Sequence, residues 1–261
     1  MKLAKYILTS VCLLTATFAH AQQERPHHYH YIYGGYNTMT ATNKEEKLHY
    51  DGFTLGWQYT LNVMKNVPMY VGIGAGFYTN WHHNPLRELT TTVQMPFDDD
   101  DLPDYKMLMK YHYRAEEKVS YGGIRVPFNF SYEIAIPNSK VTIIPQLGFH
   151  INYNLWAHEH DKGEEGILDV KLIDDDDNVY DIDDDLRKEL IGMDPLDESF
   201  SMLGDTDLGY DTFNKIQVGW QTGMRVNYGK YGVGFSYEQE IMRLCSKRTT
   251  SLFRIFFTYT L

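Results

Sequence analysis

"PMYVGIGAGFYTN", residues 68–80, decides the fold class of this chain. Every second residue from Met69 to Phe77 is apolar, and the positions between them hold tyrosine or glycine. This period of two predicts a β-strand. In a soluble sandwich the apolar face would pack on a protein core, whereas in a membrane barrel it would face lipid and the glycines would face the interior. The rest of the chain has to distinguish these two structures.

The first 21 residues indicate export. Lys2 and Lys5 precede a short apolar run at 6–18, and Ala19 and Ala21 supply the small residues that a signal peptidase recognises. We therefore expect residues 1–21 to be a signal peptide, cleaved after Ala21, since the run is too short to span a membrane.

The mature chain of about 240 residues retains one cysteine, Cys245, because Cys12 leaves with the signal. An intramolecular disulfide is therefore excluded. No later stretch approaches the ~20 apolar residues of a spanning helix. This pattern excludes a helical membrane protein but not a barrel, because alternating strands average out in a hydropathy window.

Period-two runs predict eight strands. The alternation is clearest in the later ones, and Gly34-Gly35 is expected to interrupt the register of the first at a bulge. The expected strands are 27–39, 50–62, 68–80, 119–134, 141–156, 214–228, 231–242 and 250–261.

The expected connections sort by length. Strands two and three, four and five, and six and seven are joined by short turns, whereas the other connections are longer and two are very long, at about 81–118 and 157–213. In a meander, alternate connections lie at the same end, so all short turns fall at one end and all long loops at the other. Short periplasmic turns and long external loops are typical of bacterial outer-membrane barrels.

The two faces of the expected strands support the same interpretation. Outward positions hold mostly large apolar residues, inward positions hold small and polar ones, and lysine is nearly absent from strand interiors, which disfavours the alternative of a soluble β-domain. Five tyrosines share the apolar phase near the short-turn end, as expected of an interfacial girdle. They are Tyr59, Tyr132, Tyr228, Tyr231 and Tyr259. The sequence thus predicts an all-β fold, an eight-stranded antiparallel up-and-down transmembrane β-barrel in 22–261, in the bacterial outer membrane.

Three segments resemble the PorT-like outer-membrane β-barrel family, the small eight-stranded barrels of Bacteroidota. They are the strand 121–132 with Pro127 between apolar outward residues, the glycine-alternating strand 68–80, and the closing strand. The last departs from the usual form, because Leu261 stands where an aromatic residue is commoner. The resemblance covers the strands but not the long loops. It implies an outer-membrane location and, for some members, a link to protein secretion.

Charged residues are expected to fill the interior. An eight-stranded barrel has room only for side chains, and unpaired buried charges are costly, so these charges predict a paired network that plugs the lumen. Gly72, Gly74 and Gly76 would leave space for the arginines. The alternative is a narrow channel for protons or solutes. The network would comprise Arg125, Glu133, Arg225, Glu238, Glu240 and Arg254.

A lipid-modifying barrel enzyme is a second alternative. It would need serine, histidine and an acid close together near the membrane boundary. His150 is the histidine well inside a strand, and no His-x-Ser spacing accompanies it. We therefore expect no catalytic residues, and a satisfied structural role for His150.

The second long loop is strongly acidic. Residues 161–211 contain 19 acidic and 4 basic residues. Calcium favours such oxygen-rich clusters, and Asp174, Asp176, Asn178 and Asp185 match EF-hand spacing, although Val179 and Ile182 break the motif. The alternatives are a solvated, self-repelling loop, a site where cations bridge to lipopolysaccharide phosphates, and a surface for a basic partner. No resident cofactor is expected.

Two further features lie in the expected loops. The segment 184–193 has acids first and bases later, which predicts a short helix and an ordered cap over the barrel mouth. Histidines gather at the loop end, where a transition-metal site is a further alternative. They are His82, His83, His112, His158 and His160, whereas His27, His28 and His30 map to the opposite end.

The combined expectation is a structural or interaction protein, accessory to secretion or envelope assembly. Its expected partners are outer-membrane lipid and lipopolysaccharide, and another envelope protein bound through the external loops. Nucleic acid is not expected as a partner.

Overall fold

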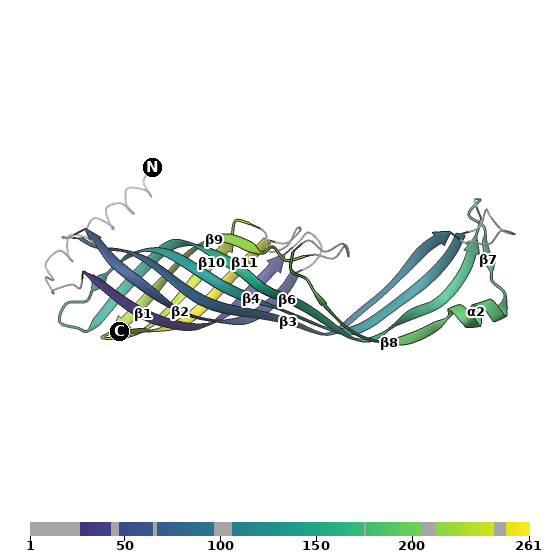
Figure 1. The fold of residues 1–261 in the computed structure, drawn as a ribbon, viewed down its shortest axis with the longest axis horizontal. Coiled ribbons are helices and arrows are strands. Elements are labelled where there is room, and N and C mark those ends of the chain that lie inside the picture. The colour runs from purple at the N-terminus through teal and green to yellow at the C-terminus, as the bar shows by residue number, and fades with distance from the viewer. Residues whose placement is uncertain are drawn as a thin grey trace, which may run out of the picture. The chain divides into compact units, whose positions relative to one another are not determined.

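The computed structural model describes residues 27–42, 47–64, 67–96, 106–174, 176–204, 212–242 and 249–261 (Figure 1). The expected signal peptide and Cys245 lie outside these residues. The chain divides into two compact units. We call them the barrel unit (Met1–Trp81, Tyr121–Ala157 and Met202–Leu261) and the second unit (His82–Ser120 and His158–Ser201).

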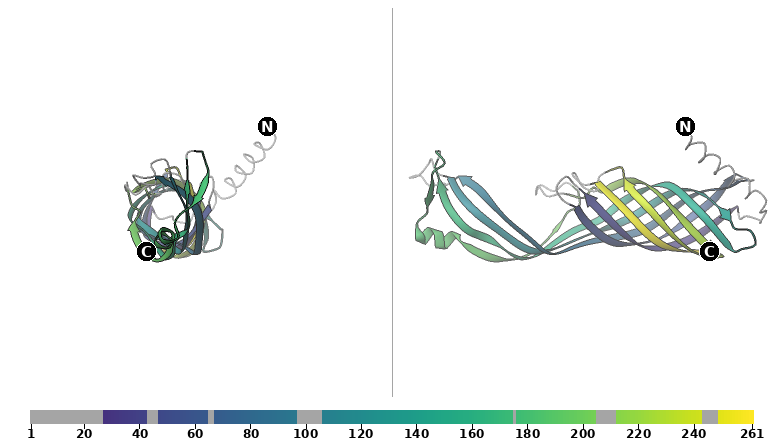
Figure 2. Two further views of the ribbon diagram at one scale, coloured as in Figure 1. Left: turned by 90° about the vertical axis from the view of Figure 1, so that its right-hand side faces the viewer. Right: turned by 180° about the vertical axis from the view of Figure 1, so that it is seen from behind.

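The barrel unit is a closed ring of antiparallel strands, visible end-on in the left view of Figure 2. In the described residues the hydrogen-bonded circuit runs β1-β2-β3-β4-β6-β9-β10-β11 and returns to β1, so the predicted antiparallel β-barrel is confirmed as the fold. The two-residue β5 (Ile134–Ala135) pairs with the start of β6. The ring strands are β1 (His28–Thr42), β2 (Lys47–Met64), β3 (Val67–Pro96), β4 (Lys106–Tyr132), β6 (Val141–Ile173), β9 (Ile216–Tyr228), β10 (Tyr231–Glu240) and β11 (Thr249–Thr260).

The first strand has no bulge. Gly34-Gly35 was expected to break its register, but β1 pairs without a shift with both β2 and β11 from Tyr31 to Thr42. Gly35 is instead a point of close approach, since a Cβ there would lie 2.7 Å from Cβ of Phe256. The expected longer connection after the first strand is also wrong, because Thr42 and Lys47 are already register partners.

The two faces of the barrel strands differ as predicted. On β3, Tyr70, Tyr78 and Asn80 are buried in the interior, whereas Ile73 and Phe77 are about half exposed on the outside. The outer surface of β11 is likewise apolar. A closed strand ring with an apolar outside and a polar inside satisfies every backbone group without water, as a transmembrane barrel requires. Separately, the described residues contain no helix that is long and apolar enough to cross a membrane.

The two regions predicted as long loops, 81–118 and 157–213, are mostly strand. β3 continues to Pro96, β4 begins at Lys106 and β6 continues to Ile173, so each of these three strands contributes to both units. The alternation in these segments is weak because many side chains are exposed on both faces, which is why the pattern suggested loops. Their pairing forms a sheet in which β4 lies beside β3 and β6, and β6 also pairs with β8 (Gly192–Ser201).

Two short elements complete the second unit in the described residues. β7 (Val179–Asp181) pairs with the distal end of β6. The predicted helix is confirmed as α2 (Asp184–Leu190), which is shorter than the expected 184–193. The side chain of Asp183 caps the helix by accepting a hydrogen bond from the Asp185 backbone N–H, and Asp184 and Asp185 in the first turn favour the helix dipole.

The glycines of β3 were expected to make room for arginines, but they do not. Gly56 on β2 and Gly76 on β3 are register partners, and the ring of Tyr33 lies over both, since a Cβ on Gly76 would be 2.6 Å from the Tyr33 hydroxyl oxygen. A Cβ on Gly72 would collide with the amide of Gln58. These glycines therefore accommodate a tyrosine and a glutamine from neighbouring strands.

Candidate functional site

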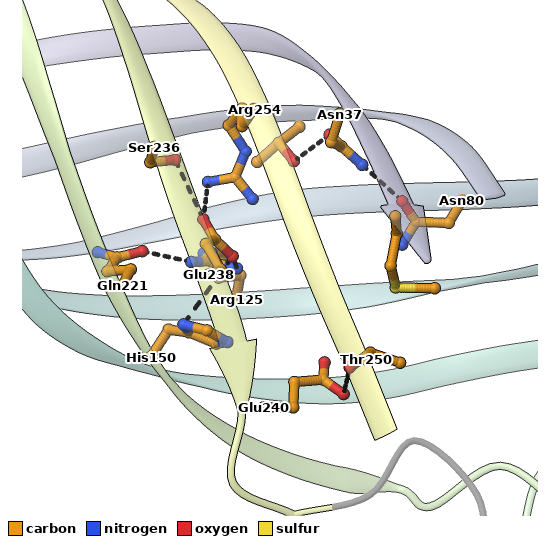
Figure 3. Close-up of polar contacts among 12 residues, drawn as sticks. Asn37, Asn80, Arg125, His150, Gln221, Ser236, Glu238, Glu240, Thr250 and Arg254 are labelled. Atoms are coloured by element: carbon orange, nitrogen blue, oxygen red, sulfur yellow. Dashed lines mark hydrogen bonds and ion pairs between the residues drawn. The ribbon is translucent and has the colours of Figure 1, made fainter. Parts of the chain in front are cut away.

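The centre of the barrel interior is an ion-paired carboxylate. Glu238 on β10 is almost fully buried, and its two oxygens pair with Nη1 of Arg125 and Nη1 of Arg254, each at 2.8 Å (Figure 3). The hydroxyl of Ser236 contacts the same carboxylate at 3.4 Å. Strand alternation places all four side chains inside, because each occupies an inward position of β4, β10 or β11.

A chain of amides extends this centre across the lumen. Nη2 of Arg125 donates to the side-chain oxygen of Gln221 at 2.5 Å, Gln221 donates to Asn129, and Asn129 donates to Gln58 at 3.1 Å. The chain links β4, β9 and β2, which are not adjacent in the ring. Buried polar networks of this kind rigidify a structure when their members are satisfied.

His150 lies beside the carboxylate without a hydrogen bond to it. Its Nδ1 is 4.0 Å from Glu238, and the ring is fully buried. The expected inward position of His150 is confirmed, but the ring is not satisfied as expected, because Nδ1 is buried without a hydrogen-bond partner. The chemistry of a nucleophilic triad is therefore not assembled around His150.

Glu240 forms a separate contact nearer the β10–β11 end. It accepts a hydrogen bond of 2.5 Å from the Thr250 hydroxyl, as Figure 3 shows. Asn37 forms another, donating to Asn80 at 2.5 Å and accepting from Thr54 at 3.0 Å. Several small polar contacts between strands therefore lie inside the barrel.

Arg225 belongs to a second cluster. Its guanidinium lies 4.1 Å from the ring centroid of Tyr31 and donates to the Tyr29 hydroxyl at 3.1 Å. Glu133, which is only half-buried just after β4, lies near the same Tyr29. The six charges expected to form one network are therefore divided. Arg125, Arg254 and Glu238 pair directly, Glu240 pairs with Thr250, and Arg225 and Glu133 lie at the tyrosine cluster.

The inward tyrosines were missed by the sequence reasoning, which assigned tyrosine to the interfacial girdle. Tyr31, Tyr33 and Tyr70 join Tyr29 in a buried cluster, and Tyr121 donates to Met39 Sδ at 3.0 Å. Their alternation with small or polar residues could have revealed their facing, because the outward phase of β1 is set by Ile32 and Tyr36. Aromatic rings thus fill much of the interior that charges were expected to fill.

Two small cavities lie inside the barrel. One cavity of about 20 Å³ lies beside Glu238, Glu240 and His150, and another of about 30 Å³ lies between Gln58 and Arg254. Each has room for little more than a water molecule. Neither of these two cavities can hold a substrate larger than water.

The calcium candidates do not gather around one point. The carboxylate of Asp174 accepts hydrogen bonds from the backbone N–H of Asp176, the backbone and side chain of Asn178, and the hydroxyl of Tyr180. These hydrogen bonds lower the pKa of Asp174, and the bond from the Asn178 side chain has the largest effect. Asp185 lies in α2 and pairs with Lys188 at 3.2 Å. Among the described residues no three histidine, cysteine or acidic side chains are grouped to hold a metal.

The loop-end histidines are likewise spread over the second unit. His83 pairs with Glu116 at 2.7 Å, and His112 contacts Thr90 at 3.0 Å. His160 lies between the Ser199 hydroxyl, 2.7 Å from its Nδ1, and Asp197, 3.8 Å from its Nε2. That row has the residue types of a hydrolase triad, but its carboxylate is too distant for a hydrogen bond and about two-thirds exposed.

Comparison with known proteins leaves the family open. No family model matches the chain, and no curated protein matches it. Solved structures similar to it include Ail, the attachment invasion locus protein of Yersinia pestis, in complex with the heparin analogue sucrose octasulfate. That pair shares 13% identity over 90% of this chain and 100% of Ail, with a TM-score of 0.41.

A second similar structure is Neisserial surface protein A (NspA), which shares 8% identity over 89% of this chain and 97% of NspA, with a TM-score of 0.36. A third is the β domain of the Bordetella autotransporter BrkA, which shares 10% identity over 89% of this chain and 100% of that domain, with a TM-score of 0.29. These likenesses concern the fold alone. The assignment of this chain as a transmembrane β-barrel accordingly rests on its own strand pairing and on the polarity of its two faces.

Proposed function

We propose that this protein is a bacterial outer-membrane barrel that acts as a structural or interaction protein, and not as an enzyme or an open channel. The observation that carries the proposal is the ordered second unit, in which paired strands occupy regions where connecting loops would suffice to close the barrel. A membrane anchor alone has no need of such a sheet. The PorT-like resemblance and an accessory role in secretion or envelope assembly belong to this proposal.

The filled interior supports a plug. Arg125, Arg254 and Glu238 meet at 2.8 Å inside the barrel, and the tyrosine cluster occupies the end near Tyr29. Ions would have to displace these paired charges to pass. In planar bilayers the purified protein should therefore be electrically silent, and steady single-channel currents would contradict the plug.

The acidic second unit supports a role in contacting another envelope protein. Crosslinking in intact cells tests this. A photoreactive phenylalanine analogue placed at Tyr180, which is exposed in the second unit, should form an adduct with a protein partner. The same analogue at Tyr237, exposed on the apolar outside of the barrel, is the matched control and should react with lipid. Absence of protein adducts from Tyr180 and from further exposed positions of the second unit would count against the proposal.

A lipid-modifying enzyme remains the rival to exclude. Incubation of the purified protein with lipid A and phospholipids should leave both chemically unchanged. Product formation that disappears in the Ser199→Ala variant would replace the interaction role with an enzymatic one, with the Ser199–His160 pair as its site.

A further inference from the structure

The sheet of the second unit has two faces of different chemistry. One is identified by three contacts that lie on the same side of the sheet. Tyr113 donates to Asp161 at 2.8 Å, Tyr111 donates to Glu165, and Arg87 pairs with Glu117 at 3.0 Å. Because alternate residues of a strand share a face, the odd-numbered residues of these segments of β3, β4 and β6 belong to it. We call it the acidic face.

The acidic face also carries exposed apolar side chains. On β3, Leu89, Val93 and Met95 share the face of Arg87. On β4, Met107 and Met109 share the face of Tyr111 and Tyr113. Leu89 and Met95 are about half exposed, whereas Met107 and Met109 are only partly exposed. Methionine and tyrosine are the residue types enriched where proteins bind flexible partners, because the thioether adapts its shape and the phenol combines an apolar ring with a polar end.

Carboxylates without a cationic partner border these apolar residues. The pairing of β6 with β8 sets Asp161 beside Glu198 and Glu165 beside Asp194. Among the described residues, none of these four carboxylates forms an ion pair with a lysine or an arginine. Arg87 and Arg187 instead pair with Glu117 and Asp169.

Asp161 is the most informative of the four. It is more than nine-tenths buried, and while Oδ2 accepts from Tyr113, Oδ1 has no hydrogen-bond partner. Burial, together with this hydrogen bond, raises the pKa of Tyr113, so its hydroxyl stays a donor at neutral pH. A buried carboxylate oxygen without a donor is costly, which favours a ligand that supplies one.

The opposite face lacks this imbalance. There Lys118 contacts Glu116 at 2.8 Å, and Arg114 lies 3.9 Å from Glu164. Cations and anions alternate on that side, so it offers no comparable attraction for either sign of charge.

We propose that the acidic face binds a basic, amphipathic polypeptide segment, whose cations meet Asp161, Glu165, Asp194 and Glu198 and whose aliphatic side chains pack on the methionines and Leu89. Charge complementarity and the exposed apolar residues on one face carry this choice of occupant. The inference rests on the proposed interaction role and names the partner class of the same unit.

Binding of a designed peptide tests the site without knowledge of the native partner. The full-length protein is placed in phosphatidylcholine nanodiscs, and a fluorescent peptide that alternates blocks of leucine and lysine is titrated by anisotropy, with empty nanodiscs as background. A peptide with glutamate in place of lysine and one with glycine in place of leucine are the matched ligands. The lysine–leucine peptide should bind saturably, and at least about tenfold more tightly than either of the others.

Two variants locate the site. Met107→Ser/Met109→Ser changes no charge and should weaken binding at least about tenfold, and Asp161→Asn should weaken it severalfold. Asp176→Asn/Asp177→Asn removes two carboxylates from the turn after β6, and asparagine tolerates the positive φ of 62° at Asp177. This control should leave binding unchanged. Folding of each variant is checked by the β-strand signal in circular dichroism and by the difference in gel mobility between unheated and heated protein.

Three results would overturn the inference. They are no saturable binding, equal binding by the glutamate peptide, and equal affinity of the methionine double variant and the turn control. The last would mean that the general negative charge of the protein attracts the peptide. Failure here would remove the acidic face as a site but would leave the interaction role to be decided by crosslinking from Tyr180, so the two proposals can fail separately.

Discussion

Arg125 on β4 and Glu238 on β10 form an ion pair of 2.8 Å across the interior of the barrel. β6 and β9 lie between these two strands in the ring, so the pair spans the lumen rather than joining neighbours. Both side chains are nearly fully buried, as is Arg254, which pairs with the other oxygen of the same carboxylate. The contact therefore ties together strands far apart in the ring through one anion.

Removing the central anion should destabilise the barrel strongly. In Glu238→Gln, Arg125 and Arg254 would stay buried without a counter-charge, and breaking a buried ion pair in this way costs about 3–5 kcal/mol. The measurement is reversible urea unfolding in lipid, followed by tryptophan fluorescence. The exposed Glu164→Gln, whose partner Arg114 is 3.9 Å away, is the control and should change the free energy of unfolding by less than about 1 kcal/mol.

A combined replacement distinguishes charge from shape in this cluster. Substituting Arg125, Arg254 and Glu238 together by methionine should recover most of the stability lost in Glu238→Gln, because no unpaired charge remains. If Glu238→Gln were as stable as the wild type, the ion pairs would not hold the barrel together.

Close packing at Gly76 leads to a second prediction. A methyl group there would lie 2.6 Å from the Tyr33 hydroxyl oxygen and 2.9 Å from the Leu55 carbonyl oxygen, so Gly76→Ala should destabilise by about 1–3 kcal/mol. Adding Tyr33→Phe should restore part of this loss, because the nearest atom is then absent. The Tyr33 hydroxyl is buried without a hydrogen-bond partner, so Tyr33→Phe alone should have little effect.

Gly34→Ala is the matched control for this pair. A Cβ at Gly34 meets nothing closer than Leu55 Cδ1 at 3.6 Å, an ordinary contact, and the change also reduces the entropy of the unfolded chain. Both glycine variants are compared by the same unfolding measurement. Equal stability of the two would show that Tyr33 does not press on Gly76.

Alternation in the sequence predicted correctly which way many of the barrel residues point, although the inward tyrosines of β1 were missed. Arg125, His150 and Arg254 are buried, and Ile73 and Phe77 are exposed, as the period of two predicted. This works because the side chains of a strand must alternate, and because lipid and lumen demand opposite polarities.

The partners of these residues could not be predicted in the same way. Arg225 meets Tyr29 and Tyr31 rather than Glu238, because contacts across a lumen depend on strand tilt and stagger, which alternation does not encode. The strands of the second unit were missed for a different reason. Neighbouring residues such as Leu89 and Thr90, which point to opposite faces of β3, are both exposed, so burial imposes no period on that segment.

Acid should destabilise the pairing of β3 and β4 near Glu116. Hydrogen bonds from Lys118 and from His83 lower the pKa of this carboxyl below its ordinary 4.5, and the bond from Lys118 has the larger effect. A lowered pKa in the folded state means that the contribution to stability is complete above pH 4.5 and disappears as the pH falls through the folded-state pKa. Hydrogen exchange of the β3 and β4 amides near His83 and Glu116 measures this contribution.

The Glu116→Gln variant isolates that effect from other carboxyls. Near neutral pH its amides should exchange faster than those of the wild type, and the difference should shrink toward zero in acid, where the wild-type carboxyl is protonated. A difference independent of pH would indicate that packing of the side chain, and not its charge, protects these amides.

The apolar outside of the barrel gives the last prediction, which tests the membrane assignment itself. Ile255 lies in the middle of β11 on the outward face and is about half exposed. Lysine at a lipid-facing position near the bilayer midplane costs about 2–4 kcal/mol, so Ile255→Lys should make folding into phosphatidylcholine vesicles less favourable by that amount. Val93→Lys, at an exposed position of the second unit, should change it by less than about 0.5 kcal/mol. If both variants folded as well as the wild type, and all three folded in buffer without lipid or detergent, the outer face of β11 would not face lipid, and the apolar phase that begins with Met69 would have to be buried against another protein.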